Sequence, residues 1–236
     1  MVRALRTFAG NSPRNSDFYG SPLARAIHTP SFFDADVENA HINLHKKVLT
    51  PENIGEAFRE SGVPNEVDYV STDVDSIDVW LFHGLLASGY RPRVVSVEYN
   101  SNFPMDTPLA CERKWVPWKR KSRIYGSSAA SINLVAEMFG YQVVEIMPKL
   151  DMFFVLKDTL DSICTAESLA SYEFLAKEFV GVRTKSTCSR EEAQRLVDFP
   201  LALKGLETEA KAKAMANIEE MNRMFRERFN GPFCAI

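Results

Sequence analysis

Three aspartates, Asp73, Asp75 and Asp78, lie within six positions at the edge of an apolar run in residues 67–82 (VDYVSTDVDSIDVWLF). Asp73 and Asp75 are two residues apart, so an extended chain places both on one side, ~7 Å apart. At an effective dielectric constant of about 20, two negative charges at that separation repel by about 2 kcal/mol. Something must offset this repulsion, and the chemistry open to such carboxylates is proton transfer or the binding of a cation.

Two of the three aspartates have an ordinary structural explanation. A helix that begins near Ile77 offers unpaired N–H groups and the positive end of its dipole. Asp75 or Ser76 could cap this helix, and Asp78 would lie in its first turn. Asp73 has no such explanation, because it ends a strand at the place where open α/β sheets bind ligands. We therefore expect Asp73 to face a ligand; the alternative is a helix cap beside a solvated strand end.

The segments around these aspartates alternate between short apolar runs and helical stretches. The expected strands cover residues 30–36, 67–73, 93–100, 141–147 and 152–158, and the expected helices cover 37–45, 50–62, 77–88 and 127–139. This alternation predicts a parallel sheet covered by helices. The link between the last two strands is too short for a crossover helix, so they must form an antiparallel hairpin. The expected fold class is α/β: a mostly parallel sheet with helices on both faces and an antiparallel closing hairpin.

Only helices are expected after residue 160, as a helical C-terminal extension. One begins at Thr165, and another begins at a capping box made by Ser189 and Glu192. A long helix at about 201–229 carries an apolar stripe that recurs mostly every four residues, at Leu206, Ala210, Ala214, Ile218, Met221 and Phe225. This helix either packs on its own domain or docks a partner protein. The chain thus divides into a basic N-terminal arm (1–29), an α/β domain (30–158) and the extension (159–236).

The composition is typical of an intracellular protein. The 236 residues carry a net charge of -3, which gives no general reason to expect nucleic acid or an anionic membrane as a partner. No run approaches the ~20 apolar residues of a membrane span. The four cysteines lie far apart without a CxxC pair, so we expect free thiols in a reducing compartment. The arginine-rich first 30 residues resemble an organelle transit segment, which makes a mitochondrion or another organelle a second expected location.

A basic loop with two tryptophans offers another binding surface. Residues 114–123 (KWVPWKRKSR) could bind a phosphate group or a single-stranded nucleic acid. The alternative, which we favour, is a loop that covers the open end of the sheet, with Trp115 or Trp118 buried as a lid. His41 and His45 would share a helix face with Glu38, but a zinc site needs a further ligand that nothing nearby supplies. We therefore assign no metal site.

Several landmarks between residues 48 and 158 occur in the order found in one enzyme family. These are Asp73, Asp75, Asp78 and Trp80, then Arg91-Pro92-Arg93 and Glu98-Tyr99-Asn100, then Tyr125-Gly126-Ser127-Ser128 and Gly140-Tyr141. The series resembles the core signature of the FkbM-like methyltransferases, a branch of the class I S-adenosylmethionine-dependent enzymes.

The resemblance implies a pocket that lies after the strand at 67–73. Asp73 and Asp75 would face the substrate or the methionine end of S-adenosylmethionine, and Asp73 would act as the base if the methyl acceptor is an oxygen. The further contacts implied by the resemblance are cofactor contacts from Asp78, Asp34 and Asp36, and substrate contacts from Tyr99, Asn100 and Trp118.

The cofactor half of the family pattern is shorter in this chain. A class I enzyme opens with a strand and a glycine-rich turn, whereas residues 8–15 (FAGNSPRN) hold one glycine, and Ser76 stands where the family has a glycine. Two functions stay open. One is an S-adenosylmethionine-dependent methyltransferase that acts on a small-molecule acceptor. The other is a catalytically inactive structural subunit that contacts other protein subunits through the N-terminal arm and the 201–229 helix.

Overall fold

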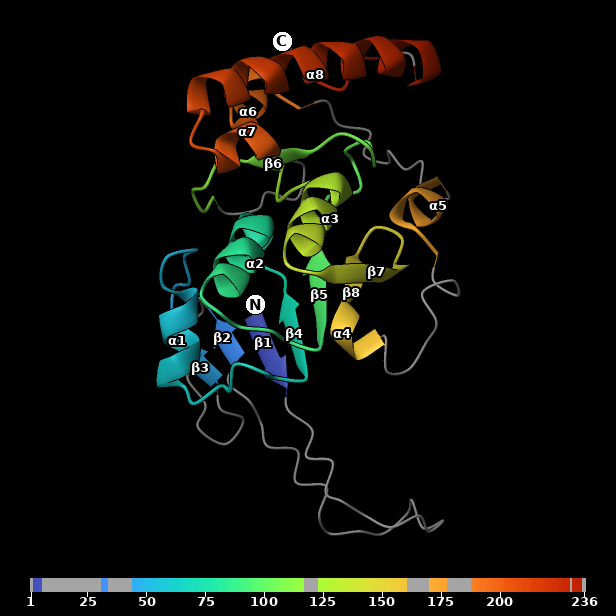
Figure 1. The fold of residues 1–236 in the computed structure, drawn as a ribbon. Helices are drawn as coiled ribbons and strands as arrows, with labels where there is room; N and C mark the ends of the chain where they lie inside the picture. Colours follow the sequence, from blue (N-terminus) through green and yellow to red (C-terminus); the bar gives the residue numbers. More distant parts are fainter. Residues whose placement is uncertain are drawn as a thin grey trace.

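The computed structural model of the chain describes residues 2–5, 31–33, 44–116, 123–160, 170–177, 188–229 and 231–234 (Figure 1). Most of the predicted N-terminal arm, most of the helix expected at 37–45, and the site candidates Asp34, Asp36 and Trp118 lie outside these residues. The described part has the predicted α/β character, with one large sheet, a small second sheet and helices.

The large sheet is mixed rather than mostly parallel. Its seven strands, in spatial order, are β3 (Leu44–Lys46), β2 (Ser31–Phe33), β1 (Val2–Leu5), β4 (Tyr69–Thr72), β5 (Val94–Glu98), β8 (Asp151–Leu156) and β7 (Tyr141–Ile146). Only the β2–β3 and β4–β5 pairs are parallel; β1 runs antiparallel to both neighbours, and β8 runs antiparallel to β5 and β7. The closing hairpin β7–β8 is confirmed, because the four residues between its strands leave room only for a tight turn.

The first strand of the sheet was not predicted. Residues 2–5 belong to the expected N-terminal arm, yet β1 lies in the middle of the sheet, where Leu5 pairs with Tyr69 and Val2 pairs with Phe32. Numbered in chain order, the first five strands are arranged 3-2-1-4-5, which is the order of the doubly wound nucleotide-binding sheet. The reversed direction of β1 is the departure from that fold.

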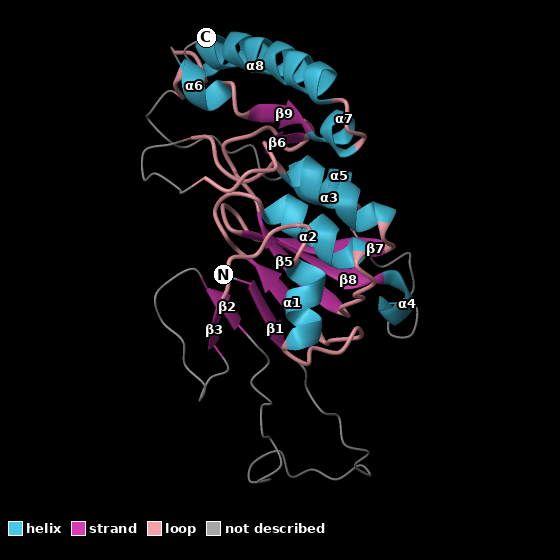
Figure 2. Ribbon diagram, turned by 90° about the vertical axis from the view of Figure 1, so that its left-hand side faces the viewer, coloured by secondary structure: helices cyan, strands magenta, loops and turns pink. Residues whose placement is uncertain are grey.

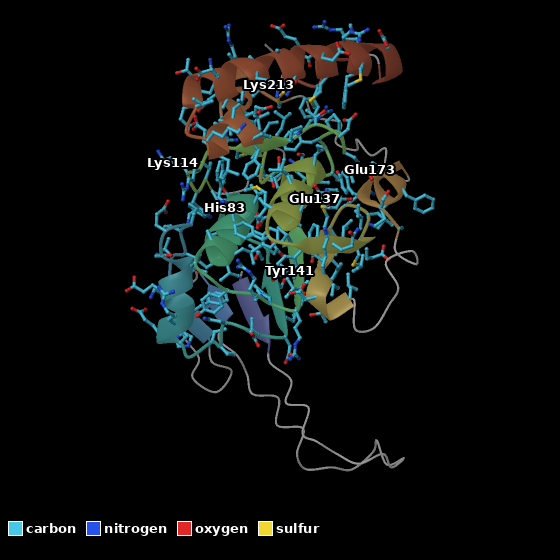
Figure 3. All side chains as sticks on the ribbon, viewed as in Figure 1. His83, Lys114, Glu137, Tyr141, Glu173 and Lys213 are labelled. Atoms are coloured by element: carbon cyan, nitrogen blue, oxygen red, sulfur yellow. A yellow bond between two sulfur atoms is a disulfide. The ribbon has the colours of Figure 1, made fainter. Side chains whose placement is uncertain are left out.

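Three helices cover one face of this sheet: α1 (Ile54–Glu60), α2 (Asp78–Ala87) and α3 (Ala129–Met138). Figures 1 and 2 show all three on the same side of the sheet. Helices were expected on both faces, but none of these three covers the opposite face. The core beneath them is aromatic. Phe82 of α2 stacks on Phe154 of β8 and meets Tyr141 of β7 edge to face, and the buried Tyr141 hydroxyl donates to the Pro92 carbonyl. Tyr141 is labelled in Figure 3.

A second layer lies beyond the open end of the sheet (Figure 1). Its elements are β6 (Leu109–Cys111), which pairs antiparallel with β9 (Leu196–Asp198), and the helices α6 (Arg190–Ala193), α7 (Phe199–Leu203) and α8 (Glu207–Phe229). Two short helices, α4 (Lys157–Leu160) and α5 (Tyr172–Lys177), follow the hairpin. The extension is therefore not purely helical, because β9 adds a strand beside β6.

The long C-terminal helix packs on its own chain. The helix expected at 201–229 is two helices, because Gly205 adopts a left-handed φ of 76° after α7 and α8 begins two residues later. Five of the six predicted stripe residues are buried, and Leu206 is 42% exposed. The stripe from Ala214 to Phe225 closes a second core with Phe103, Leu109 and Ile124, whereas Ala210 belongs to the first core. The packing alternative is confirmed, and among the described residues no helix has the length and apolar character needed to cross a membrane.

Two cysteines are paired, which corrects the expectation of free thiols. Cys188 and Cys234 form a disulfide, with their Cα atoms 4.4 Å apart. The sequence did not reveal this pair, because the two cysteines are 46 positions apart in the chain and only folding brings them together. Cys111 is a buried free thiol, and Cys164 lies outside the described residues.

Candidate functional site

An acidic cluster forms where two neighbouring parallel strands end. Asp73 follows β4, Asp75 lies two residues later, and Glu98 is the last residue of β5. Carboxylate oxygens from these three residues lie within 4.8 Å of one another. The parallel register, which pairs Thr72 with Val97, brings them together. The structure thus joins the two predicted catalytic residues and adds Glu98, which the sequence analysis quoted as part of a motif but did not assign to the site.

Burial and mutual repulsion raise the pKa values of Glu98 and Asp75 in this cluster. The pKa of the half-buried Glu98 rises to about 9, first because burial disfavours its charge and then because Asp78, Asp73 and Asp75 repel it. Burial, followed by repulsion from Asp73, also raises the pKa of Asp75. At neutral pH Glu98 therefore keeps its proton, and the exposed Asp73 lies beside a neutral carboxyl group.

Asp151 and Tyr125 extend the acidic surroundings. Asp151 begins β8 opposite Glu98, and burial followed by repulsion from Asp73 raises its pKa. The pKa of the half-buried Tyr125 is raised by burial and then by Glu98. A positive ligand would relieve these repulsions, since each carboxylate then gains an opposite charge.

The turn that carries the cluster is left-handed at Asp75, where φ is 58°. Aspartate tolerates this conformation better than most residues, because its short polar side chain can bond locally. The glycine of the family pattern is aligned with Ser76, one residue later. Ser76 is buried, and its hydroxyl accepts a hydrogen bond from the Val116 N–H at 2.9 Å, so the serine connects this turn to the loop that contains Trp115.

Asp78 stabilises the turn and has no exposed surface for a cofactor. Its side chain is fully buried and accepts hydrogen bonds from the N–H groups of Val74 (2.7 Å) and Ser76 (3.0 Å). Burial raises its pKa to about 7 although these bonds oppose the rise. Asp78 thus has a structural role, and its predicted cofactor contact stays a prediction. The predicted cap is wrong, because α2 has Ile77 at its N-cap position and no side-chain cap.

Tyr99 and Asn100, for which substrate contacts were predicted, are both buried and hydrogen-bonded within the protein. Tyr99 is 2% exposed, and its hydroxyl accepts a hydrogen bond from the Lys149 N–H. The buried Asn100 donates to the carbonyls of Arg123 (2.7 Å) and Tyr125 (2.9 Å), and its own side-chain oxygen accepts from Asn102. These hydrogen bonds hold the segment after β5 in place, and the substrate contacts of both residues stay a prediction.

The remaining candidates lie elsewhere. Asp34, Asp36 and Trp118 fall outside the described residues. Either Trp115 or Trp118 was expected to be a buried lid; Trp115 is 46% exposed, so the test of this expectation falls on Trp118. His45 lies on the strand β3 rather than on the expected helix.

Comparison of the chain with protein-family models, with curated proteins and with solved structures found no match. The chemistry of the site therefore has to be judged from its geometry. Three clustered carboxyl groups, one of which keeps its proton at neutral pH, can bind a positively charged group and can transfer a proton. Oxygen ligands of this kind also suit a hard divalent cation, and the expectation of no metal stays a prediction.

Proposed function

We propose that this chain is a methyltransferase-like protein whose acidic cluster binds the positively charged methionine end of S-adenosylmethionine. The observation that carries this proposal is the meeting of Asp73, Asp75 and Glu98 at the carboxyl ends of β4 and β5. Ligands of open α/β sheets bind outside these strand ends. The strand order 3-2-1-4-5 supports a nucleotide-binding type of sheet.

The donor set fits one part of the cofactor. A sulfonium and an ammonium group are both cations, and carboxylates that repel one another are the groups that a cation stabilises most. The cofactor supplies an activated methyl group, so the protein has mainly to align the acceptor with it. In this proposal Asp75 and Glu98 hold the cation, and the exposed Asp73 accepts the proton of an oxygen nucleophile. The residues proposed for the ribose, Asp34 and Asp36, lie outside the described part.

The second candidate function is a catalytically inactive structural subunit. It is favoured by the burial of Asp78, Tyr99 and Asn100, three motif residues whose polar groups have protein partners. In that case these motif residues serve to hold the fold together. A partner protein that contacts α8 would meet its polar outer face, because the apolar stripe is already covered.

Thermal unfolding with and without S-adenosylmethionine separates the two candidates. A ligand present at 100 times its dissociation constant adds about 2.7 kcal/mol to the free energy of unfolding. We expect millimolar cofactor to raise the melting temperature of the wild type and of Glu66→Gln, a control at an exposed acid before β4. We expect a smaller rise for Asp75→Asn, because Asp75 is one of the two residues that hold the cation in this proposal. The absence of a rise in the wild type would favour the structural subunit.

A further inference from the structure

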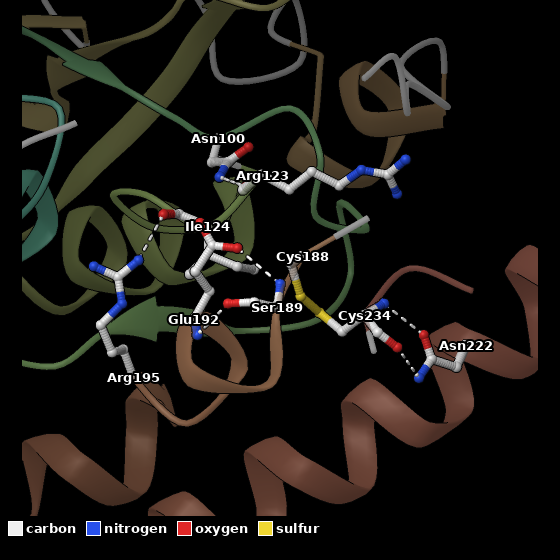
Figure 4. Close-up of a disulfide and its surroundings, with 9 residues drawn as sticks. All are labelled: Asn100, Arg123, Ile124, Cys188, Ser189, Glu192, Arg195, Asn222 and Cys234. Carbon is white, nitrogen blue, oxygen red and sulfur yellow. Dashed lines mark hydrogen bonds between the residues drawn. A yellow bond between two sulfur atoms is a disulfide. The ribbon is translucent and has the colours of Figure 1, made fainter. Parts of the chain in front are cut away.

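The disulfide fastens the C-terminal end of the chain into the second core (Figure 4). Cys188 and Cys234 are each 1% exposed, and the Cys188 N–H donates to the Phe233 carbonyl at 3.0 Å. A short parallel bridge joins the two cysteines besides their sulfur atoms. The last described residues of the chain are therefore a covalently attached part of this core.

The same residues are held by Asn222 of α8. Its side chain donates to the Cys234 carbonyl (3.0 Å) and accepts from the Cys234 N–H (2.7 Å), as Figure 4 shows. The fully buried Phe233 packs against the rings of Phe225, at 5.1 Å, and Phe103, at 6.2 Å. Without the sulfur bond, these non-covalent contacts would have to keep the segment in place.

The buried Arg123 connects this segment to the end of β5. Its guanidinium group lies over the ring of Phe233, 5.6 Å from the ring centre. The backbone carbonyl of Arg123 accepts a hydrogen bond from Asn100, which lies two residues after Glu98. Arg195 donates to the next carbonyl, that of Ile124, at 3.4 Å. Residues 123–125 thus lie between the C-terminal segment and the strand end that carries the acidic cluster.

We propose that the Cys188–Cys234 disulfide is a redox-sensitive latch, and that it sets how firmly residues 100–103 and 123–125 are held. A cellular dithiol reduces it through a mixed disulfide. The dithiol gives two electrons and two protons and leaves as its own disulfide, while Cys188 and Cys234 become thiols. Because both sulfurs are buried, the reductant attacks when residues 231–234 open. This proposal does not depend on cofactor binding.

Hydrogen exchange of the full chain, combined with peptide mapping without reductant, tests the latch. We expect a linked peptide pair that contains Cys188 and Cys234 and disappears with dithiothreitol. Reduction should speed exchange at least tenfold at the amides of Cys188 and Cys234, and also at Asn102 and Phe103, whose N–H groups bond to Asn100. Exchange in α1 should stay unchanged.

Two variants complete the experiment. The double variant Cys188→Ser/Cys234→Ser should show the reduced pattern without reductant, and Cys111→Ala should respond to reductant as the wild type does. If the double variant does not fold, hydrogen exchange of the wild type with and without dithiothreitol still tests the latch. The latch is overturned if the linked pair is absent, if reduction leaves exchange unchanged, or if faster exchange is confined to residues 231–234.

Discussion

The carboxyl groups of Asp78 and Glu98 show how one residue type takes different roles at one strand end. Asp78 is buried, and two backbone N–H groups bind it, so it organises the turn. Glu98 is half-buried beside other carboxylates and has its pKa raised to about 9, so it holds a proton at neutral pH. A bound cation would favour the loss of this proton. Sequence spacing marked Asp73 and Asp75 correctly as neighbours. It also placed Asp78 in the first turn of the helix, as the structure has it, but it could not show that Asp78 is fully buried, because burial depends on the packing of α2.

Removal of the Asp78 carboxylate should destabilise the fold. Asp78→Ala leaves the N–H groups of Val74 and Ser76 without their partner, and each unpaired buried group costs about 1–3 kcal/mol. We expect a loss of about 2–4 kcal/mol in urea unfolding, and a smaller loss for Asp78→Asn, which keeps one acceptor oxygen. Asp158→Asn, at an exposed acid, is the control. A loss below that of the control would contradict the structural role of Asp78.

The raised pKa of Glu98 predicts how stability varies with pH. Between an unfolded value near 4.5 and a folded value of about 9, the folded chain binds more protons than the unfolded chain. The contribution of Glu98 to the free energy of unfolding therefore falls as the pH rises through this range. Glu98→Gln, which mimics the protonated form, should remove that fall and be more stable than the wild type by on the order of 1 kcal/mol at pH 8, after allowing for water at this half-buried site.

Urea unfolding of the wild type, Glu98→Gln and the control Glu66→Gln at pH 5 and pH 8 measures this effect. We expect Glu98→Gln to gain on the wild type as the pH rises, whereas Glu66→Gln follows the wild type. A Glu98→Gln variant that tracks the wild type at both pH values would show that Glu98 ionises normally.

At the scale of helices and strands, contacts between elements explain structural features that the local sequence pattern does not predict. Gly84 lies inside α2, where the helix backbone passes Pro51 so closely that an added Cβ would lie 2.3 Å from the Pro51 oxygen. The strands of the hairpin were predictable because their link is short. β9 was not predictable, since its three residues lead directly into α7 and pair only with the distant β6. The division of the 201–229 helix depends likewise on a single left-handed glycine.

Gly84→Ala should destabilise the protein, although alanine is the better helix former. Helix propensity alone predicts a gain of about 1 kcal/mol. The clash with the Pro51 backbone forces α2 away from the start of α1 and should cost more than this gain, with a net loss of about 1–3 kcal/mol. Thermal unfolding of the variant gives the sign directly, and a higher melting temperature than that of the wild type would show that α2 and Pro51 are not in close contact.

The internal packing of α8 makes its stripe residues essential for the isolated chain. Ile218 is completely buried, so Ile218→Ala should cost about 2–4 kcal/mol in urea unfolding. Its exposed neighbour provides the control, and Glu219→Ala should change stability by less than about 0.5 kcal/mol. Equal stabilities of the two variants would mean that the stripe does not pack on its own chain and is available to a partner protein instead.

At the scale of the whole molecule, two cores meet at the end of the sheet that carries the acidic cluster. The alternation of strands and helices predicted the α/β class, and the closing hairpin followed from chain length. The central position of β1 could not be predicted, because four residues at the start of the chain show no period and are ordered only by β2 and β4. The Cys188–Cys234 pair was hidden for the same reason, since only the folded second core brings the two residues together.

Isothermal titration with S-adenosylmethionine tests the central claim most directly, with the wild type, the double variant Asp73→Asn/Asp75→Asn and the control Glu66→Gln. Asparagine keeps the left-handed turn at position 75 while it removes the charge. We predict binding to the wild type and the control, and a dissociation constant at least tenfold larger for the double variant, which corresponds to about 1.4 kcal/mol. Equal affinity in all three proteins, or no heat of binding with the wild type at millimolar cofactor, would contradict a cation-binding role for the acidic cluster.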